Sequence, residues 1–271
     1  MYPLGGESRL FIYFIIFYYY FKYFNFYRLV LLKDYVYISY YLVVMNMKNL
    51  IAHRGVNNLD FGENTKEAAV NSLKNSYIKG VEIDARITKD NKIVVIHDMT
   101  INRTSTGSGF VSKMNLRDLR KYNFGTDKHF SKISTLKEIL KVIDKDKIVL
   151  IEIKYEGNDD NRYIKYFYRS VKPFLNKNIY IMSFNGKLVR KLKEKYPFLK
   201  CGILISYIIN ASFIDDNMDF IAISSYSVNK VKNINKPIFV WALNSKKKYL
   251  ELLDKMSSNT YYIVDVPKDY V

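Results

Sequence analysis

From residue 48 onward, short apolar runs alternate with polar, lysine-rich segments, and this alternation limits the folds that the chain can adopt. No run exceeds seven residues, and the runs are rich in Ile and Val, which is typical of strands covered on both faces. We therefore expect nine strands. They span residues 49–53, 80–85, 92–97, 147–153, 178–183, 201–206, 219–224, 237–243 and 261–265.

Segments with helical character lie between these runs, and several begin at a residue suited to capping a helix, such as Thr65, Asn185 or Ser245. Strands that alternate with helices indicate parallel βαβ units, and eight such units form a (β/α)₈ TIM barrel of about 250 residues. We predict this α/β fold for residues 47–271. The expected helices span residues 65–79, 135–144, 161–175, 185–195 and 245–255.

Nine strand candidates are one too many for the eight places in such a barrel, so one of them lies outside it or is misread. The segment between Asp84 and Lys92 is too short to hold an ordinary crossover helix. It is either an extended return or the turn of a hairpin.

Residues 1–46 form a hydrophobic, aromatic-rich extension that differs in composition from the rest of the chain. Eleven of the 25 tyrosines and six of the 17 phenylalanines precede residue 50. The uncharged run 10–21 is shorter than the roughly 20 apolar residues that cross a bilayer. Lengthening the run to residue 32 brings in Lys22, Asn25 and Arg28.

Two interpretations of this extension are open. Because aromatic residues favour membrane interfaces, residues 10–32 would act as a membrane anchor in one of them. In the other, the extension lies upstream of the true start, at Met45 or Met47. There is no convincing secretory signal, since no basic residue precedes Arg9 and no small-residue cleavage site is evident. We expect a cytoplasmic or membrane-associated protein.

The formal charge of +17 favours anionic partners such as phosphate esters, nucleic acid or an acidic membrane surface. The abundance of Lys, Asn, Ile and Tyr also fits AT-rich codon usage, in which case much of the charge is solvated lysine. Only the net charge favours nucleic acid, so we expect no such partner. The single cysteine, Cys201, excludes an internal disulfide framework, and we expect it to be buried and inert.

Acidic residues interrupt two of the apolar runs. Side chains at positions i and i+2 of a strand share a face, so Glu82 and Asp84 project together, as do Glu152 and Lys154. Burying carboxylates is costly unless a cation compensates them. Two acids from one strand and a third from another suit a hard divalent cation, Mg²⁺ or Ca²⁺. The alternative is that these acids pair with lysines at the barrel rim.

Two of the three histidines, His53 and His97, each end an expected strand. The carboxyl ends of barrel strands form the active-site face, where two imidazoles beside a metal and a phosphate could act as general base and general acid. His129 has no such neighbours in the sequence, and we expect it in a surface loop.

Two cationic side chains accompany these groups. Arg54 follows His53 directly and could bind a phosphate through two hydrogen bonds, while Lys154 would add a positive charge. The only tryptophan, Trp241, either walls the pocket or belongs to the core.

A series of motifs occurs in one order along residues 49–267. They are AHRG, the following ENT, GVEIDARITKDNKIVVIHD, NRTSTGSG, IEIK, MSF, VWALN and a divergent YIVDVP. This series resembles the glycerophosphodiester phosphodiesterase family, most strongly over residues 51–154. The resemblance implies a metal-dependent TIM-barrel hydrolase that cleaves glycerophosphodiesters to an alcohol and glycerol 3-phosphate.

Matching the motif positions implies a role for each candidate residue. The acid–base pair would be His53 and His97. The metal ligands would be Glu82, Asp84 and Glu152, with Glu63 of ENT as an additional ligand or a group just behind the ligands. The substrate contacts would be Arg54 and Lys154 at the phosphate, and Trp241 in the pocket wall. Tyr262 and Val264 depart from the glycine and threonine that relatives often carry, which puts the glycerol-side wall in question.

The reaction and its rivals stay open at this point. The nucleophile is either the glycerol C2 hydroxyl, which gives a cyclic phosphate that water then opens, or water itself. A second enzymatic interpretation is a lysophospholipase D-type activity on membrane lipids. A third is a catalytically silent barrel that binds polyanions or a membrane complex, although such a barrel would need no metal cluster.

Overall fold

The computed structural model describes residues 49–270, apart from 57, 209–213, 232–233 and 254. The predictions for residues 1–46, including the anchor at 10–32, fall outside the described residues. In the part of the chain that is described, no helix is both long enough and apolar enough to cross a membrane.

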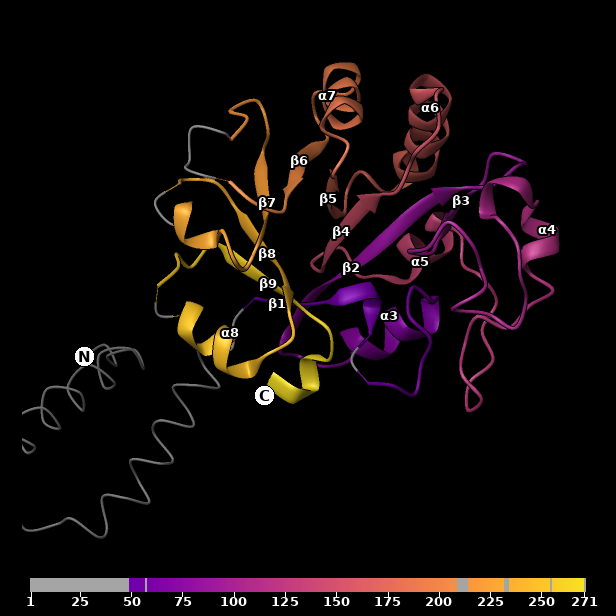
Figure 1. Ribbon diagram of the computed structural model, residues 1–271, viewed down its shortest axis with the longest axis horizontal. Coiled ribbons are helices and arrows are strands. Elements are labelled where there is room, and N and C mark those ends of the chain that lie inside the picture. The colour runs from indigo at the N-terminus through magenta and orange to yellow at the C-terminus, as the bar shows by residue number, and fades with distance from the viewer. Residues whose placement is uncertain (1–48, 57, 209–213, 232–233, 254, 271) are drawn as a thin grey trace, which may run out of the picture. The chain divides into compact units, whose positions relative to one another are not determined.

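Eight parallel strands form a closed barrel (Figure 1). The first strand pairs with both the second and the last, which closes the ring. The barrel strands are β1 (Leu50–Ala52), β2 (Ile78–Ile87), β4 (Ile148–Ile153), β5 (Asn178–Ser183), β6 (Lys200–Ile205), β7 (Phe220–Ser224), β8 (Ile238–Leu243) and β9 (Thr260–Val264). The predicted α/β barrel is confirmed.

The strand candidate that does not belong to the barrel is β3 (Ile93–Val95), which was expected at residues 92–97. It pairs antiparallel with the last residues of β2, so the hairpin alternative is correct. The expectation that His97 follows the carboxyl end of a barrel strand was wrong, because β3 runs in the opposite direction to the barrel strands. The hairpin instead returns the chain toward the site, where the Ile96 N–H donates to the Asp84 carbonyl at 2.9 Å.

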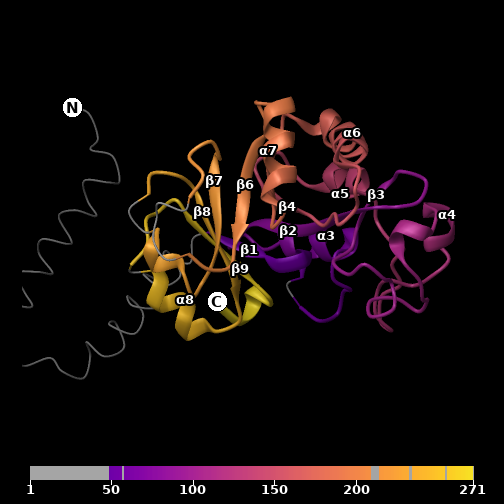
Figure 2. The same cartoon turned by 45° about the horizontal axis from the view of Figure 1, so that its top comes forward.

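Helices lie on the outside of the ring of strands (Figures 1 and 2). They are α3 (Lys66–Leu73), α5 (Leu136–Val142), α6 (Asp160–Val171), α7 (Gly186–Lys195) and α8 (Lys246–Leu253). Helix α4 (Leu116–Leu119) lies apart from the ring, beyond β3 at the right of Figure 1. Short 3₁₀ turns are η1 (His53–Gly55), η2 (Val111–Lys113), η3 (Lys172–Phe174), η5 (Val228–Lys230) and η6 (Pro267–Tyr270).

Side-chain caps begin the helices where the sequence predicts them. The Thr65 hydroxyl and the Asn185 amide oxygen accept the backbone N–H of Ala68 and Leu188, which satisfies otherwise free donors of the first turn. Helix α3 ends at Leu73 rather than at residue 79, because β2 already begins at Ile78. Helix α4 and the long connection around it, between β3 and α5, were not predicted.

The barrel interior is filled with apolar rings. Tyr180, Phe220 and Phe239 approach one another with centroid distances of 5.1 to 5.3 Å. Gly202 faces this cluster, and a Cβ at that position would come within 2.6 Å of the Phe220 ring. Such a packed layer leaves no pore, so a ligand can enter only above it, toward the carboxyl ends of the strands.

Candidate active site

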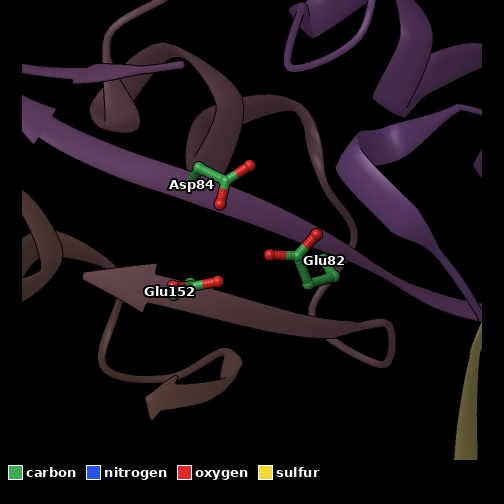
Figure 3. Close-up of side chains that lie close together, drawn as sticks. All are labelled: Glu82, Asp84 and Glu152. Atoms are coloured by element: carbon green, nitrogen blue, oxygen red, sulfur yellow. The ribbon is translucent and has the colours of Figure 1, made fainter. Parts of the chain in front are cut away.

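Three buried carboxylates lie above the apolar layer. Glu82 and Asp84 come from β2 and Glu152 from β4, with Asp84 and Glu152 directly paired in the strand register. One oxygen from each lies within 4.8 Å of the others, and Figure 3 shows the three carboxyl groups converging from neighbouring strands. Their exposed fractions are 2%, 1% and 8%.

Fixed cations compensate this cluster only in part. Lys154 Nζ lies 2.7 Å from Glu152 and 3.6 Å from Asp84, while Arg54 Nε is 3.8 Å from Asp84. Burial, followed by the charge of Asp84, raises the pKa of Glu82 to about 8 and also raises the pKa of Glu152. A divalent cation would favour the ionised form of these groups, so the set fits a hard metal ion with oxygen ligands.

The turn after β1 carries two site residues, His53 and Arg54. Arg54 and Gly55 both adopt left-handed backbone angles, with φ of 52° and 70°. Glycine adopts this conformation readily, whereas it is costly for Arg54. The resulting turn directs the Arg54 N–H to Glu82 Oε2 at 3.0 Å, and the Ser72 hydroxyl donates to the Gly55 carbonyl at 2.6 Å. Strained backbone of this kind is typical of functional sites.

Each residue of the ENT motif makes a different contact. Glu63 binds the guanidinium of Arg54 at 2.9 Å and is not among the three clustered carboxylates. Asn64 is buried, donates to Asp84 Oδ2 at 2.8 Å and accepts the Asp84 N–H at 3.0 Å. Thr65 caps α3. The motif therefore fixes the position of Asp84 through two hydrogen bonds of the Asn64 side-chain amide.

His53 contacts one carboxylate on each side of its ring. Nδ1 lies 2.6 Å from Asp265 Oδ1, just after β9, and Nε2 lies 3.8 Å from Glu82. Burial lowers the pKa of His53, but the hydrogen bond with Asp265 and the charge of Glu82 outweigh burial and raise it. Asp265 thereby fixes the ring orientation and leaves Nε2 directed at the acidic cluster.

His97 belongs to a second network. Its Nδ1 lies 2.7 Å from Asp98, and Arg103 binds Asp98 and also Glu63, at 2.7 and 2.8 Å. Burial lowers the pKa of His97 although Asp84 and Asp98 oppose it. The hydrogen bonds of Arg103 hold the pKa of Asp98 well below its usual range. Because Glu63 is bound to Arg54 as well, this network joins the β1 and β3 sides of the site.

A cavity of about 200 Å³ opens above the cluster. It brings together both histidines, both candidate phosphate-binding side chains and an apolar wall that includes Trp241. Its lining residues are His53, Arg54, Glu82, His97, Glu152, Lys154, Met182, Phe184, Leu204, Trp241, Ala242 and Ile263. Trp241 is half-buried and meets Phe184 edge-on at 5.5 Å between ring centroids. The predicted site residues thus converge, except Glu63, which does not line the cavity and instead binds the guanidinium of Arg54.

Two residues excluded from the site by the sequence are indeed elsewhere. His129 is exposed in a loop and stacks on Phe61. Cys201 is buried, and burial raises the pKa of its thiol to about 12, which suits an unreactive cysteine.

Comparison with known proteins agrees with this geometry. The model of the glycerophosphoryl diester phosphodiesterase family matches residues 53–257. The chain belongs to this family. A glycerophosphodiester phosphodiesterase of Caldanaerobacter subterraneus is 36% identical over 170 residues, which cover 58% of this chain and 67% of that protein. The YhdW protein of Bacillus subtilis is 30% identical over 220 residues, 73% of this chain and 87% of its own.

Solved structures of the phosphodiesterase family share the fold. A phosphodiesterase of Oleispira antarctica, in complex with the product sn-glycerol-3-phosphate, aligns with a TM-score of 0.74 at 21% identity over 84% of this chain and 97% of its own. The glycerophosphodiester phosphodiesterase of Agrobacterium tumefaciens aligns with a TM-score of 0.67 at 21% identity, covering 82% and 99%.

Four residues that support the site of this phosphodiesterase-family chain were not assigned a role from the sequence. They are Asn64, Asp98, Arg103 and Asp265. Asp98 and Asn64 each adjoin a residue that was singled out, so an acid or amide next to a candidate was the available signal. Asp265 is the acid of the divergent YIVDVP motif, but its contact with His53 was not predictable, because the two residues lie 212 positions apart.

Proposed function

We propose that this protein hydrolyses glycerophosphodiesters to an alcohol and glycerol 3-phosphate, with a divalent cation, Mg²⁺ or Ca²⁺, held by Glu82, Asp84 and Glu152. The observation that carries the proposal is the position of this under-compensated acidic cluster beneath a cavity that both histidines line. Membership of the phosphodiesterase family supports it, as does the product bound to the Oleispira relative.

Each side chain of the cavity has a task that its position allows. Arg54 and Lys154 line the cavity and would bind the anionic phosphate, where they also offset the charge that develops during cleavage. One imidazole would take the proton of the nucleophile and the other would protonate the leaving alkoxide. When bound, the cation would supply Lewis-acid stabilisation of the phosphate oxygen. Trp241 and its apolar neighbours would exclude water from one side.

The carboxylates behind the imidazoles set their orientation. Asp265 and Asp98 each contact an Nδ1, which leaves both Nε2 atoms available to the cavity. Such carboxylate–imidazole pairs fix the ring and its tautomer. A substrate analogue that lacks the glycerol C2 hydroxyl separates the two routes of attack, because only direct attack by water would cleave it.

Chelation tests the proposed function. Release of glycerol 3-phosphate from glycerophosphocholine should stop after EDTA treatment and return with Mg²⁺ or Ca²⁺. Glu152→Gln should abolish turnover, whereas Glu194→Gln, on the exposed surface of α7, should not change it. Full activity after exhaustive chelation would refute the metal assignment, and metal-replete protein without turnover would favour a silent binding barrel.

A further inference from the structure

Three exposed aromatic side chains follow three consecutive barrel strands. Phe184 comes directly after β5, Tyr207 two residues after β6 and Tyr226 two residues after β7. Their exposed fractions are 51%, 73% and 92%. Single exposed aromatic side chains are common on protein surfaces, whereas several that gather at one end of a barrel are a feature of interaction surfaces. We call these three residues the aromatic arc.

Hydrogen bonds between the loops make the arc continuous. The backbone N–H of Ile208, next to Tyr207, donates to the hydroxyl of Ser227, next to Tyr226. The N–H of Ser225, on the other side of Tyr226, donates to the carbonyl of Trp241. Trp241 in turn contacts the Phe184 ring. The three loops are therefore tied to one another and to the wall of the cavity, since Phe184 and Trp241 both line it.

Positive charges predominate in the segments that carry the arc. Exposed Lys187, Lys230 and Lys247 follow β5, β7 and β8, beside the arc. The segments 184–190, 206–208, 225–231 and 244–250 contain no acidic residue. Arg190 and Lys248 of these segments pair with Asp215 and Glu251. Lys187, Lys230 and Lys247 form no ion pair with the described residues and leave an excess of positive charge.

We propose that the aromatic arc and its lysines form a docking surface for an anionic lipid membrane, which holds the cavity mouth against the bilayer. Tyrosine places its ring at the level of the lipid head groups and keeps its hydroxyl in water, and lysines beside it attract anionic lipids. Resting on the proposed function, this placement directs the enzyme to glycerophosphodiesters that retain an acyl chain and reside in a membrane.

Charge complementarity favours this occupant over a second copy of the chain. The arc has an excess of positive charge, so two copies would bring like charges together across a symmetric interface. An anionic bilayer meets both the aromatic rings and the lysines with suitable groups.

The single tryptophan of the chain provides a direct test. In the full-length protein, Trp241 fluorescence should be quenched by phosphatidylcholine–phosphatidylglycerol vesicles whose lipids are brominated near the head of the acyl chains. The vesicle affinity measured by this quenching should fall at least about tenfold in the double variant Tyr207→Ser/Tyr226→Ser. It should fall to a similar extent in the triple variant Lys187→Glu/Lys230→Glu/Lys247→Glu, because each set of changes removes one component of interfacial binding. This readout needs no catalysis, and the extent of Trp241 quenching at saturating vesicles reports contact of the cavity mouth with the bilayer even when another segment tethers the chain.

Matched substitutions at the opposite end of the barrel serve as controls. Phe198, 61% exposed between α7 and β6, and the exposed lysines Lys141, Lys145 and Lys195 lie there. The vesicle affinity measured by quenching should stay within about twofold of wild type in both control variants, Phe198→Ser and the triple change Lys141→Glu/Lys145→Glu/Lys195→Glu. Absent quenching, or equal losses in arc and control variants, would overturn the proposal. A dimer in light scattering that the tyrosine variant abolishes would assign the surface to a second copy.

Activity separates the docking surface from the proposed reaction. The arc variants should lose turnover of a lysophospholipid carried in anionic vesicles and keep turnover of soluble glycerophosphocholine. Equal turnover of the vesicle substrate by wild type and arc variants would overturn the proposal. If neither substrate is cleaved, the proposed reaction fails while the quenching result still decides the docking surface.

Discussion

The histidines divide into two environments that predict opposite effects of substitution. His53 and His97 line the cavity and each contacts a carboxylate, whereas His129 stacks on Phe61 in an exposed loop. General acid and base groups each typically contribute about 10²–10⁴-fold to the rate. His53→Ala and His97→Ala should lower kcat on that scale while circular dichroism stays native-like, and His129→Ala should remain near wild type. A larger loss for His129→Ala than for the other two would place the site elsewhere.

Glu82 makes the stability of the metal-free protein depend on pH. Its pKa is raised from an ordinary 4.5 to about 8 in the folded state, first by burial and then by Asp84. The folded protein therefore holds a proton that the unfolded chain releases, and the free energy of unfolding falls as pH rises between about 4.5 and about 8. Asp98 and Asp265, whose pKa values are lowered in the folded state, change the free energy of unfolding only at pH values below this window.

Urea unfolding at several pH values tests this linkage. In EDTA the midpoint should decline from pH 5 to pH 8, and Glu82→Gln, which cannot ionise, should flatten the decline. Added Mg²⁺ or Ca²⁺ should stabilise most at the alkaline end, because metal ligands must be deprotonated. A midpoint that rises with pH in EDTA would show that Glu82 is ionised without a metal.

At the scale of elements, strands were easier to predict than their connections. Runs such as 147–153 and 178–183 are recognisable because a strand buried on both faces must be apolar throughout. The direction of β3 was not readable, since a short apolar run looks the same in a hairpin and in a parallel crossover. His97 reaches the site only because that hairpin turns back, which depends on pairing between β2 and β3.

The interior of β6 offers a stability prediction. A Cβ at Gly202 would lie 2.6 Å from the Phe220 ring, in a layer that Tyr180 and Phe239 already fill. Gly202→Val should lower the free energy of unfolding by about 1–3 kcal/mol or more, as overpacked cores do. Trimming the opposing ring in Gly202→Val/Phe220→Leu should restore part of that loss, because the two residues share one space. Equal stability of Gly202→Val and wild type in urea would contradict this packing.

At the scale of the whole molecule, the acidic cluster was predictable and the groups that orient it were not. Glu82 and Asp84 share a strand face, so their proximity follows from local periodicity alone. His53 and Asp265 are 212 positions apart, and the pairing of β1 with β9 brings them together. Glu63 and Arg103 are 40 positions apart, and they meet because β1 lies beside β2 and the β2–β3 hairpin returns the chain. Local patterns can therefore identify the chemistry of the site but not its support.

Barrel closure also defines which part of the chain is needed for folding. All eight barrel strands lie between Leu50 and Val264, and β1 closes the ring by pairing with β2 and β9. Asn49 extends this connection, since its side-chain amide donates to the carbonyls of Ser258 and Thr260, both at 2.9 Å. A chain that starts at Met47 keeps every one of these contacts.

We therefore predict that residues 47–271 fold and are fully active in aqueous buffer, whereas a chain that starts at Val56 and lacks β1 does not fold. The segment 10–32 is marginal for spanning a bilayer, because Lys22 and Arg28 would each cost about 2.5–3.5 kcal/mol at its centre. If that segment is translated, it should hold the enzyme at a membrane with its charged side chains extended to the interface. Cell fractionation together with sequencing of the native N-terminus tests this anchor. A native protein that begins at Met1 and stays in the soluble fraction would contradict it, and an insoluble or inactive 47–271 fragment would show that the barrel depends on the preceding residues.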